Sequence, residues 1–324
     1  MAKFLVTIVD QLDFALDHLV LEDINYKRLS LVLVDNVVEL VLHRYAEHKG
    51  GENRYRGNSP KNDPKLVAAA LGQFFDPKVK LAKSCGFLDE QTTQTITTLH
   101  EFRNQLYHRG IVHEAILPAL VLFYFRVACD VMIRYEPFGY SWGSSNRVPL
   151  RAMKYVGVNP MSNPTKDFPA AWKRLKEVSE AIPLRLVDTL HSHMEEVIEE
   201  TDRLIDYVVG GAPDGSTRLD VVLDSQAWGI AFTDKGRNFA AKNGCTIGTV
   251  GGYVDWLKAN YPWTIRTDPI PSWRGRLSSL KSETDDHKAL RRYTEFMSQT
   301  EELREAIDRT AEALDQHVES QMGR

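Results

Sequence analysis

The chain has 324 residues, of which 43% are hydrophobic, and its formal net charge at pH 7 is −4. This length and composition exclude a globally disordered chain and are sufficient for two domains of ordinary size. Because the net charge is negative, any contact with nucleic acid requires a local basic patch rather than a generally cationic surface.

The cysteines and the apolar stretches restrict the class of protein further. Cys85, Cys129 and Cys245 are odd in number and far apart, and no His/Cys cluster has the spacing of a zinc site. The first residues are too short for a secretion signal, and the stretch Ile111–Ile133 is interrupted by charged residues and a proline. We therefore expect a cytoplasmic protein with no metal site, no cofactor and no membrane contact.

In the first part of the chain, apolar residues at steps of three or four predict helices over residues 6–21 and 26–45. The stretch 47–64 is rich in Gly, Asn and Pro, which predicts a polar loop. Four more helices are expected over 65–75, 77–85, 89–108 and 113–134. Gly86 suits a helix end and Asp89 a helix start.

The second part of the chain is also expected to be mainly helical. Residues 137–166 are rich in Pro and Gly and predict a connection. Helices should resume over 168–181, 184–209 and 286–322. Between them, residues 210–280 have mixed character, and the short apolar runs Leu219–Ser225 and Trp228–Phe232 could be strands.

The segment Leu99–Gly110 holds the most informative polar residues of the chain. On a helix that turns about 100° per residue, Asn104 and His108 lie on nearly the same face, with Arg103 beside Asn104. The expected buried stripe of this helix consists of Ile96, Leu99, Phe102 and Leu106. The helix would thus present an imidazole, an amide and a guanidinium as one polar patch.

These three side-chain types suit cleavage of RNA without a metal ion. The imidazole of His108 can take a proton from a ribose 2′-hydroxyl or give one to the leaving 5′-oxygen. The guanidinium of Arg103 can pair with phosphate oxygens, and Asn104 can orient the phosphate or the imidazole. The alternative is an ordinary polar helix face, with a histidine near the C-terminal end, where a cation is favoured.

The six residues Arg103–His108 match the motif R-N-x-x-x-H, and the chain resembles the HEPN superfamily over about residues 5–135. Members of that family have a four- or five-helix bundle with the motif on a late helix. The resemblance implies an HEPN-like bundle over 1–136, followed by the connection 137–166. Residues 167–324 would then be a mostly helical extension with a regulatory or sensor role.

The resemblance also implies a mechanism and partners. HEPN ribonucleases pair two motif helices across a two-fold axis, and this chain has one full motif, so we expect a homodimer. Arg103, Asn104 and His108 would be catalytic, and cleavage would leave a 2′,3′-cyclic phosphate and a 5′-hydroxyl. The implied setting is defence, toxicity or stress response, with an antitoxin or an activating partner.

One departure from the family pattern concerns control. The toxins of this family that are silenced by nucleotidylation carry a tyrosine two residues after the motif histidine. Gly110 occupies that position here, whereas Tyr107 precedes His108. That control mechanism is therefore not transferred to this chain.

Other residues are weaker candidates for contact with RNA. Tyr107 and Arg109 adjoin His108, and the basic residues Lys49, Arg54 and Arg56 lie in the expected loop. A solvated charged surface explains the loop residues equally well.

The expected helix over 26–45 carries four polar residues, Asp35, Asn36, Glu39 and His43, in an apolar setting. Buried hydrogen-bonded groups that hold the bundle together explain them better than an extension of the site.

A second function remains open, a non-catalytic HEPN-like module that binds RNA or a protein partner. Its dimer interface would lie away from Arg103 and His108.

Overall fold

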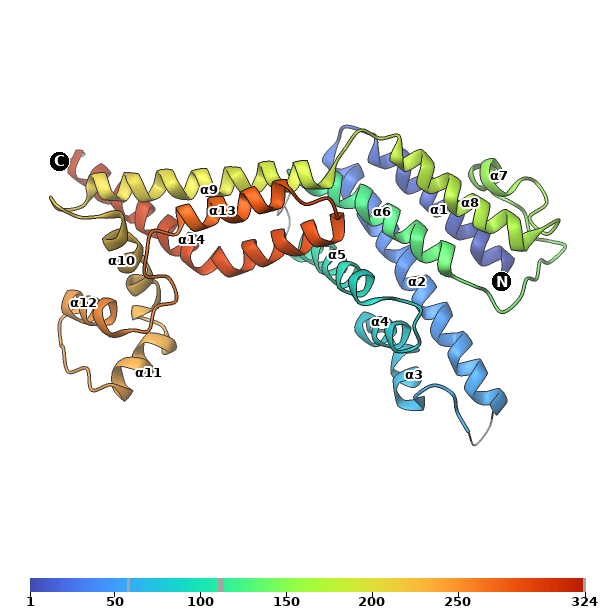
Figure 1. Cartoon of the computed structure of the whole chain (residues 1–324), viewed down its shortest axis with the longest axis horizontal. Coiled ribbons are helices and arrows are strands. Elements are labelled where there is room, and N and C mark those ends of the chain that lie inside the picture. Colours follow the sequence, from blue (N-terminus) through green and yellow to red (C-terminus); the bar gives the residue numbers. More distant parts are fainter. Residues whose placement is uncertain (57–58, 110–113, 323–324) are drawn as a thin grey trace. The chain divides into compact units, whose positions relative to one another are not determined.

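The computed structural model describes residues 1–56, 59–109 and 114–322, except for the side chains of Arg56, Tyr107, His108 and Arg109. These described residues form fourteen helices and no strand, which confirms the expected mainly α class (Figure 1). The chain divides into two compact units, Met1–Thr189 (unit 1) and Leu190–Arg324 (unit 2). Among the described helices, none has both the length and the apolar character needed to cross a bilayer.

Unit 1 is built around helix α2, which packs against α1, α3, α4, α5 and α6. Helix α6 is buried on nearly all sides, because α2 and α8 both pack on it. The helices of this unit are α1 (Ala2–Leu19), α2 (Ile24–Arg56), α3 (Pro64–Ala70), α4 (Phe75–Ser84), α5 (Glu90–Arg109), α6 (Leu117–Arg134), α7 (Leu150–Val156) and α8 (Pro164–Glu180).

The prediction of a loop over residues 47–64 is wrong for residues 47–56, because α2 continues to Arg56. Gly50 and Gly51 lower helix propensity, but α3 and α4 pack against α2 and hold it helical. The helix end is then held by Asn53, whose side chain donates to Asn62 O at 2.9 Å and accepts from Asn62 N at 3.0 Å. Tertiary contacts therefore override the local composition.

Helices α7 and α8 belong to unit 1, so the observed division at residue 189 lies later than the boundary expected from composition. The buried carboxylate of Asp13 on α1 accepts hydrogen bonds from Arg151 at 3.2 Å, Lys154 at 2.9 Å and Tyr155 at 2.7 Å. All three donors lie on α7, within the expected connection. The connection therefore contains a short helix that is fastened to α1.

Unit 2 contains most of α9 (Leu186–Gly211) and all of α10 (Arg218–Ala231), α11 (Asp234–Lys242), α12 (Val250–Asn260), α13 (Ile270–Lys281) and α14 (Asp286–Met322). The expected strands are wrong, because both apolar runs belong to α10. Thr217 and Asp220 form a capping box that starts this helix. Val222 and Ile230, which face the core, are two helical turns apart.

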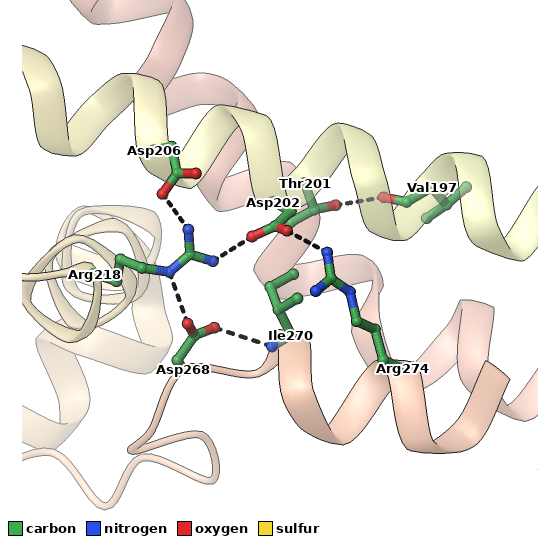
Figure 2. Close-up of polar contacts among 8 residues, drawn as sticks. All are labelled: Val197, Thr201, Asp202, Asp206, Arg218, Asp268, Ile270 and Arg274. Atoms are coloured by element: carbon green, nitrogen blue, oxygen red, sulfur yellow. Dashed lines mark hydrogen bonds and ion pairs between the residues drawn. The ribbon is translucent and has the colours of Figure 1, made fainter. Parts of the chain in front are cut away.

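Within unit 2, Arg218 is held by three carboxylates from two different elements (Figure 2). Its Nε donates to Asp268 at 2.7 Å and its Nη2 to Asp202 at 2.5 Å, while Nη1 bonds to Asp206. Asp202 also accepts from Arg274 at 2.7 Å. This cluster, which we call the Arg218 clamp, ties α9, α10 and α13 together.

Replacing Arg218 with alanine should lower the free energy of unfolding of unit 2 by ~2–4 kcal/mol. The side chain is 27% exposed, and its removal leaves three carboxylates facing one another. Lysine at this position should restore part of the lost stability, because it keeps the positive charge. The restoration should be incomplete, because an ammonium group cannot bind all three carboxylates in the geometry of a guanidinium. Urea unfolding followed by tryptophan fluorescence measures this, since four of the six tryptophans lie in unit 2. The matched control is Arg203→Ala, whose exposed pair with Glu200 should contribute less than about 0.5 kcal/mol.

Candidate functional site

The candidate site lies on α5, whose start is fixed by Asp89. The Asp89 carboxylate accepts from Thr92 N at 2.7 Å and from Arg134 at 2.9 Å. The backbone hydrogen bond from Thr92 is the main cause that lowers the pKa of Asp89 to about 2. The carboxylate is therefore ionised at neutral pH and also faces the positive end of the helix dipole.

The orientation of α5 follows from its apolar stripe. Ile96, Leu99 and Phe102 are buried, as expected, and Leu106 is half-buried. This stripe turns the face that carries Arg103 and Asn104 to the edge of the bundle, where both residues are partly exposed. Arg103 Nη1 donates to Asn104 Oδ1 at 2.9 Å, so the guanidinium and the amide form one unit.

Asp35 on α2 is the buried centre to which this unit is attached. Its side chain is only 2% exposed, and its Oδ2 lies 3.6 Å from Arg103 Nε. Its two oxygens also lie 3.0 and 3.1 Å from His100 Nδ1, and Oδ1 accepts from Tyr124 OH at 2.8 Å. We call these four residues the Asp35 cluster; it joins α2, α5 and α6.

The protonation states in the Asp35 cluster follow from the chemistry of its members. A carboxylate can only accept, so in the contact between Asp35 and His100 the ring Nδ1–H is the donor. Burial, and then the charge of Asp35, raise the pKa of Tyr124 far above its usual range. Tyr124 therefore remains a protonated donor at all ordinary pH values.

The other side of His100 is covered by the start of α4. The ring of Phe75 stacks on the His100 imidazole with centroids 3.8 Å apart and planes at 7°. Further along α4, Lys78 is 3% exposed and lies 3.2 Å from Glu39 of α2. Helix α4 thus covers a face of the His100 ring.

The third motif residue, His108, is described by its backbone alone. The chain is helical through residue 109, so Cα of His108 lies four residues from Asn104 on one continuous helix. This places it about 6 Å further along the axis and roughly 40° round. The side chains of His108, Tyr107 and Arg109, all candidates above, lie outside the described residues.

The basic candidates at the end of α2 are not brought to the Asp35 cluster. Lys49 is fourteen residues beyond Asp35 on the same helix, about 20 Å along its axis. It lies 2.8 Å from Glu52, whereas Arg54 is exposed. The side chain of Arg56 lies outside the described residues.

The polar residues of α2 have separate partners. Glu39 binds Lys78, His43 lies 3.8 Å from Glu47, and Asn36 is exposed. The expectation of buried groups is therefore wrong for these three residues, because none of them is buried and Glu39 and His43 do not pair with each other. Lys78 is thus a buried partner of α2 rather than a surface cation. Across the ranges that the structure describes, no group of three or more His, Cys, Asp or Glu side chains is placed to hold a metal ion.

Sequence reasoning missed two members of the Asp35 cluster. His100 precedes Arg103 by three residues and Asn104 by four, and this helical spacing was a usable signal. Tyr124 gave no local signal, because it is 89 residues from its partner Asp35.

The described part of the site presents the guanidinium of Arg103 and the amide of Asn104, which are attached to the Asp35 cluster. A guanidinium is suited to a phosphate group, and an amide to a phosphate oxygen or an imidazole. Comparisons with family models, curated proteins and solved structures find no match for the chain.

Replacing Asp89 with asparagine should remove an acid-dependent part of the stability of unit 1. The folded-state pKa of about 2 is below the usual 3.9 or so of an unfolded aspartate. The extra stability is therefore present above about pH 4 and is lost as the pH falls through about 2. Because the carboxylate is about half exposed, we expect a difference of ~1 kcal/mol. Urea unfolding of both proteins between pH 7 and pH 3 measures it, and parallel pH profiles would contradict this assignment.

Removing the hydroxyl of Tyr124 should destabilise unit 1 and loosen the site. Tyr124→Phe deletes a buried hydrogen bond to a carboxylate, which is worth ~1.5–3 kcal/mol. The control is Tyr135→Phe at the C-cap of the same helix, whose hydroxyl makes contacts of 3.5 Å or longer and should cost less than about 1 kcal/mol. Circular dichroism during urea unfolding measures both. Equal losses in the two variants would argue against the Asp35 cluster as a special source of stability.

Proposed function

We propose that this chain is a metal-independent endoribonuclease of the HEPN type that acts as a homodimer. The observation that carries the proposal is the hydrogen-bonded pair Arg103–Asn104 on one helix, anchored through Arg103 to buried Asp35. The R-N-x-x-x-H motif continues along this helix to His108. A cytoplasmic location, and an antitoxin or activating partner, belong to the same proposal.

In the proposed reaction, His108 of one copy takes the proton from a ribose 2′-hydroxyl. The 2′-oxygen then forms a bond to phosphorus, and the bond from phosphorus to the 5′-oxygen breaks. A second imidazole, His108 of the other copy, gives its proton to that 5′-oxygen. Arg103 binds the phosphate oxygens, on which negative charge gathers, and Asn104 orients them. The products are a 2′,3′-cyclic phosphate and a 5′-hydroxyl.

The distribution of charge supports unit 1 as the part that meets RNA. Residues 1–189 contain 24 Lys and Arg against 21 Asp and Glu, a net charge of +3. Residues 190–324 contain 16 Lys and Arg against 23 Asp and Glu, a net charge of −7. A polyanion is attracted to the first unit and repelled by the second.

The test is incubation of the full chain with tRNA or total RNA in EDTA. We expect cleavage, with fragments that end in a cyclic phosphate, and a loss of at least about 100-fold in His108→Ala and Arg103→Ala. His317→Ala and Arg203→Ala, which change exposed residues of unit 2, are matched controls and should keep full activity. Specific activity should fall when the protein is diluted below its dimerisation constant. Cleavage that survives both motif substitutions would refute the proposal.

A non-catalytic role is favoured by one specific observation, the contact of Arg103 with a buried carboxylate. In that case Arg103 is a structural partner of Asp35, and the bundle serves to bind RNA or a protein. Arg103→Ala would then lower the stability of unit 1 while no RNA is cleaved by the parent protein. Thermal unfolding measured beside the cleavage assay separates the two functions.

A further inference from the structure

Phe74 is an exposed aromatic residue beside the motif helix. It is 67% exposed, and it precedes α4 in an extended conformation with φ −79° and ψ 142°. Its backbone is fixed nonetheless, since Phe74 O accepts from Lys78 Nζ at 2.9 Å and Lys78 binds Glu39 of α2. A large apolar ring is thus presented to solvent from an anchored position.

The position of Phe74 is set by its neighbour in the chain. Phe75 is buried and stacks on His100, which precedes Arg103 by one turn of α5. Consecutive Cα atoms are about 3.8 Å apart, so Phe74 lies beside the part of α5 that carries His100. The exposed ring and the Arg103–Asn104 pair are therefore within reach of one short stretch of nucleic acid.

The size of the apolar surface indicates what it can bind. Leu71, 41% exposed, is the nearest exposed apolar neighbour in sequence, and the exposed residues nearest to the ring on either side, Gln73 and Asp76, are polar. A stable protein interface buries about 1,200–2,000 Å², whereas one aromatic side chain offers about 150–250 Å². That area matches a single nucleobase.

We propose that Phe74 is a stacking platform for an unpaired base of the RNA substrate, which makes the site selective for single-stranded segments. The inference rests on the proposed ribonuclease function and names the substrate class of the same site. Unpaired bases stack on exposed aromatic rings, whereas the bases of a duplex are already stacked on one another.

The experiment measures binding and cleavage separately, with the full chain in both cases. Binding is measured in the non-cleaving His108→Ala background by fluorescence anisotropy, with a single-stranded oligoribonucleotide and with the corresponding duplex. A stacked base contributes about 1–3 kcal/mol, so Phe74→Ala should weaken single-strand binding roughly 5- to 150-fold. Duplex binding should be unchanged. Phe74→Trp should keep the single-strand affinity, because any aromatic ring can stack.

The matched control is Phe138→Ala, which removes a ring that is 89% exposed elsewhere in unit 1 and should leave binding unchanged. In the cleaving protein, Phe74→Ala should raise KM far more than it lowers kcat. A 2-aminopurine probe in the oligonucleotide should be quenched by the parent and by Phe74→Trp, and not by Phe74→Ala.

Several results would overturn the inference. Unchanged single-strand affinity in Phe74→Ala would do so while leaving the ribonuclease function intact. A second contradicting result would be that Phe74→Ala sediments as a monomer where the parent sediments as a dimer, while the fraction of the variant that remains dimeric binds RNA as tightly as the parent. Phe74 would then be a contact between copies. If the parent neither binds nor cleaves RNA, the proposed function itself fails, and the failure is visible before any substitution at Phe74.

Discussion

The burial of Asp35 is the constraint from which the geometry of unit 1 follows. A carboxylate buried among apolar side chains destabilises the fold unless hydrogen-bond donors surround it, because its desolvation costs several kcal/mol. The donors come from α5 and α6, through His100 and Tyr124. Since a hydrogen bond tolerates only a few tenths of an ångström, these contacts fix the rotation and the register of α5 against α2. The position of Arg103 on the bundle is a consequence of that register.

The same carboxylate has two opposite effects on Arg103. It holds the guanidinium in one orientation, so that less conformational entropy is lost when a phosphate binds. It also offsets part of the positive charge that a phosphate would meet. In the proposed ribonuclease, ground-state binding of the phosphate would therefore be weaker in exchange for a preorganised guanidinium, as suits a site that stabilises the greater charge of a transition state.

Most of the helices follow from sequence periodicity, and the failures have particular causes. The last helix was predicted over 286–322, as observed for α14. The continuation of α2 through Gly50 was missed, because the contacts that support it are with other helices, α3 and α4. The apolar runs of α10 are too short for periodicity to distinguish helix from strand. For α2 the deciding contacts lie outside the window of sequence in which a pattern can be recognised, whereas α10 offered a local signal, the Thr217–Asp220 capping box, that was overlooked.

In the candidate site, too, the features found from sequence are local and the features missed depend on residues distant in the chain. Arg103 and Asn104 were found because they are adjacent on one helix, and local spacing places them together. Their attachment to Asp35 was not found, because that residue is 65 positions from His100 and 89 from Tyr124. Asp35 itself was expected to be a buried hydrogen-bonded group, and its low exposure and three partners confirm this. What a local pattern cannot give is which buried carboxylate a motif residue will face.

Comparison of the two arginine clusters shows why the phosphate site is expected at Arg103 rather than at Arg218. Arg218 faces three carboxylates, so that an approaching phosphate would meet an excess of negative charge. Arg103 lies beside the carboxylate of Asp35, which His100 shares. Coulomb repulsion between like charges a few ångströms apart is several kcal/mol at the dielectric of a protein surface. An arginine that forms ion pairs with several carboxylates therefore holds helices together, whereas an arginine with fewer carboxylates around it can bind a phosphate.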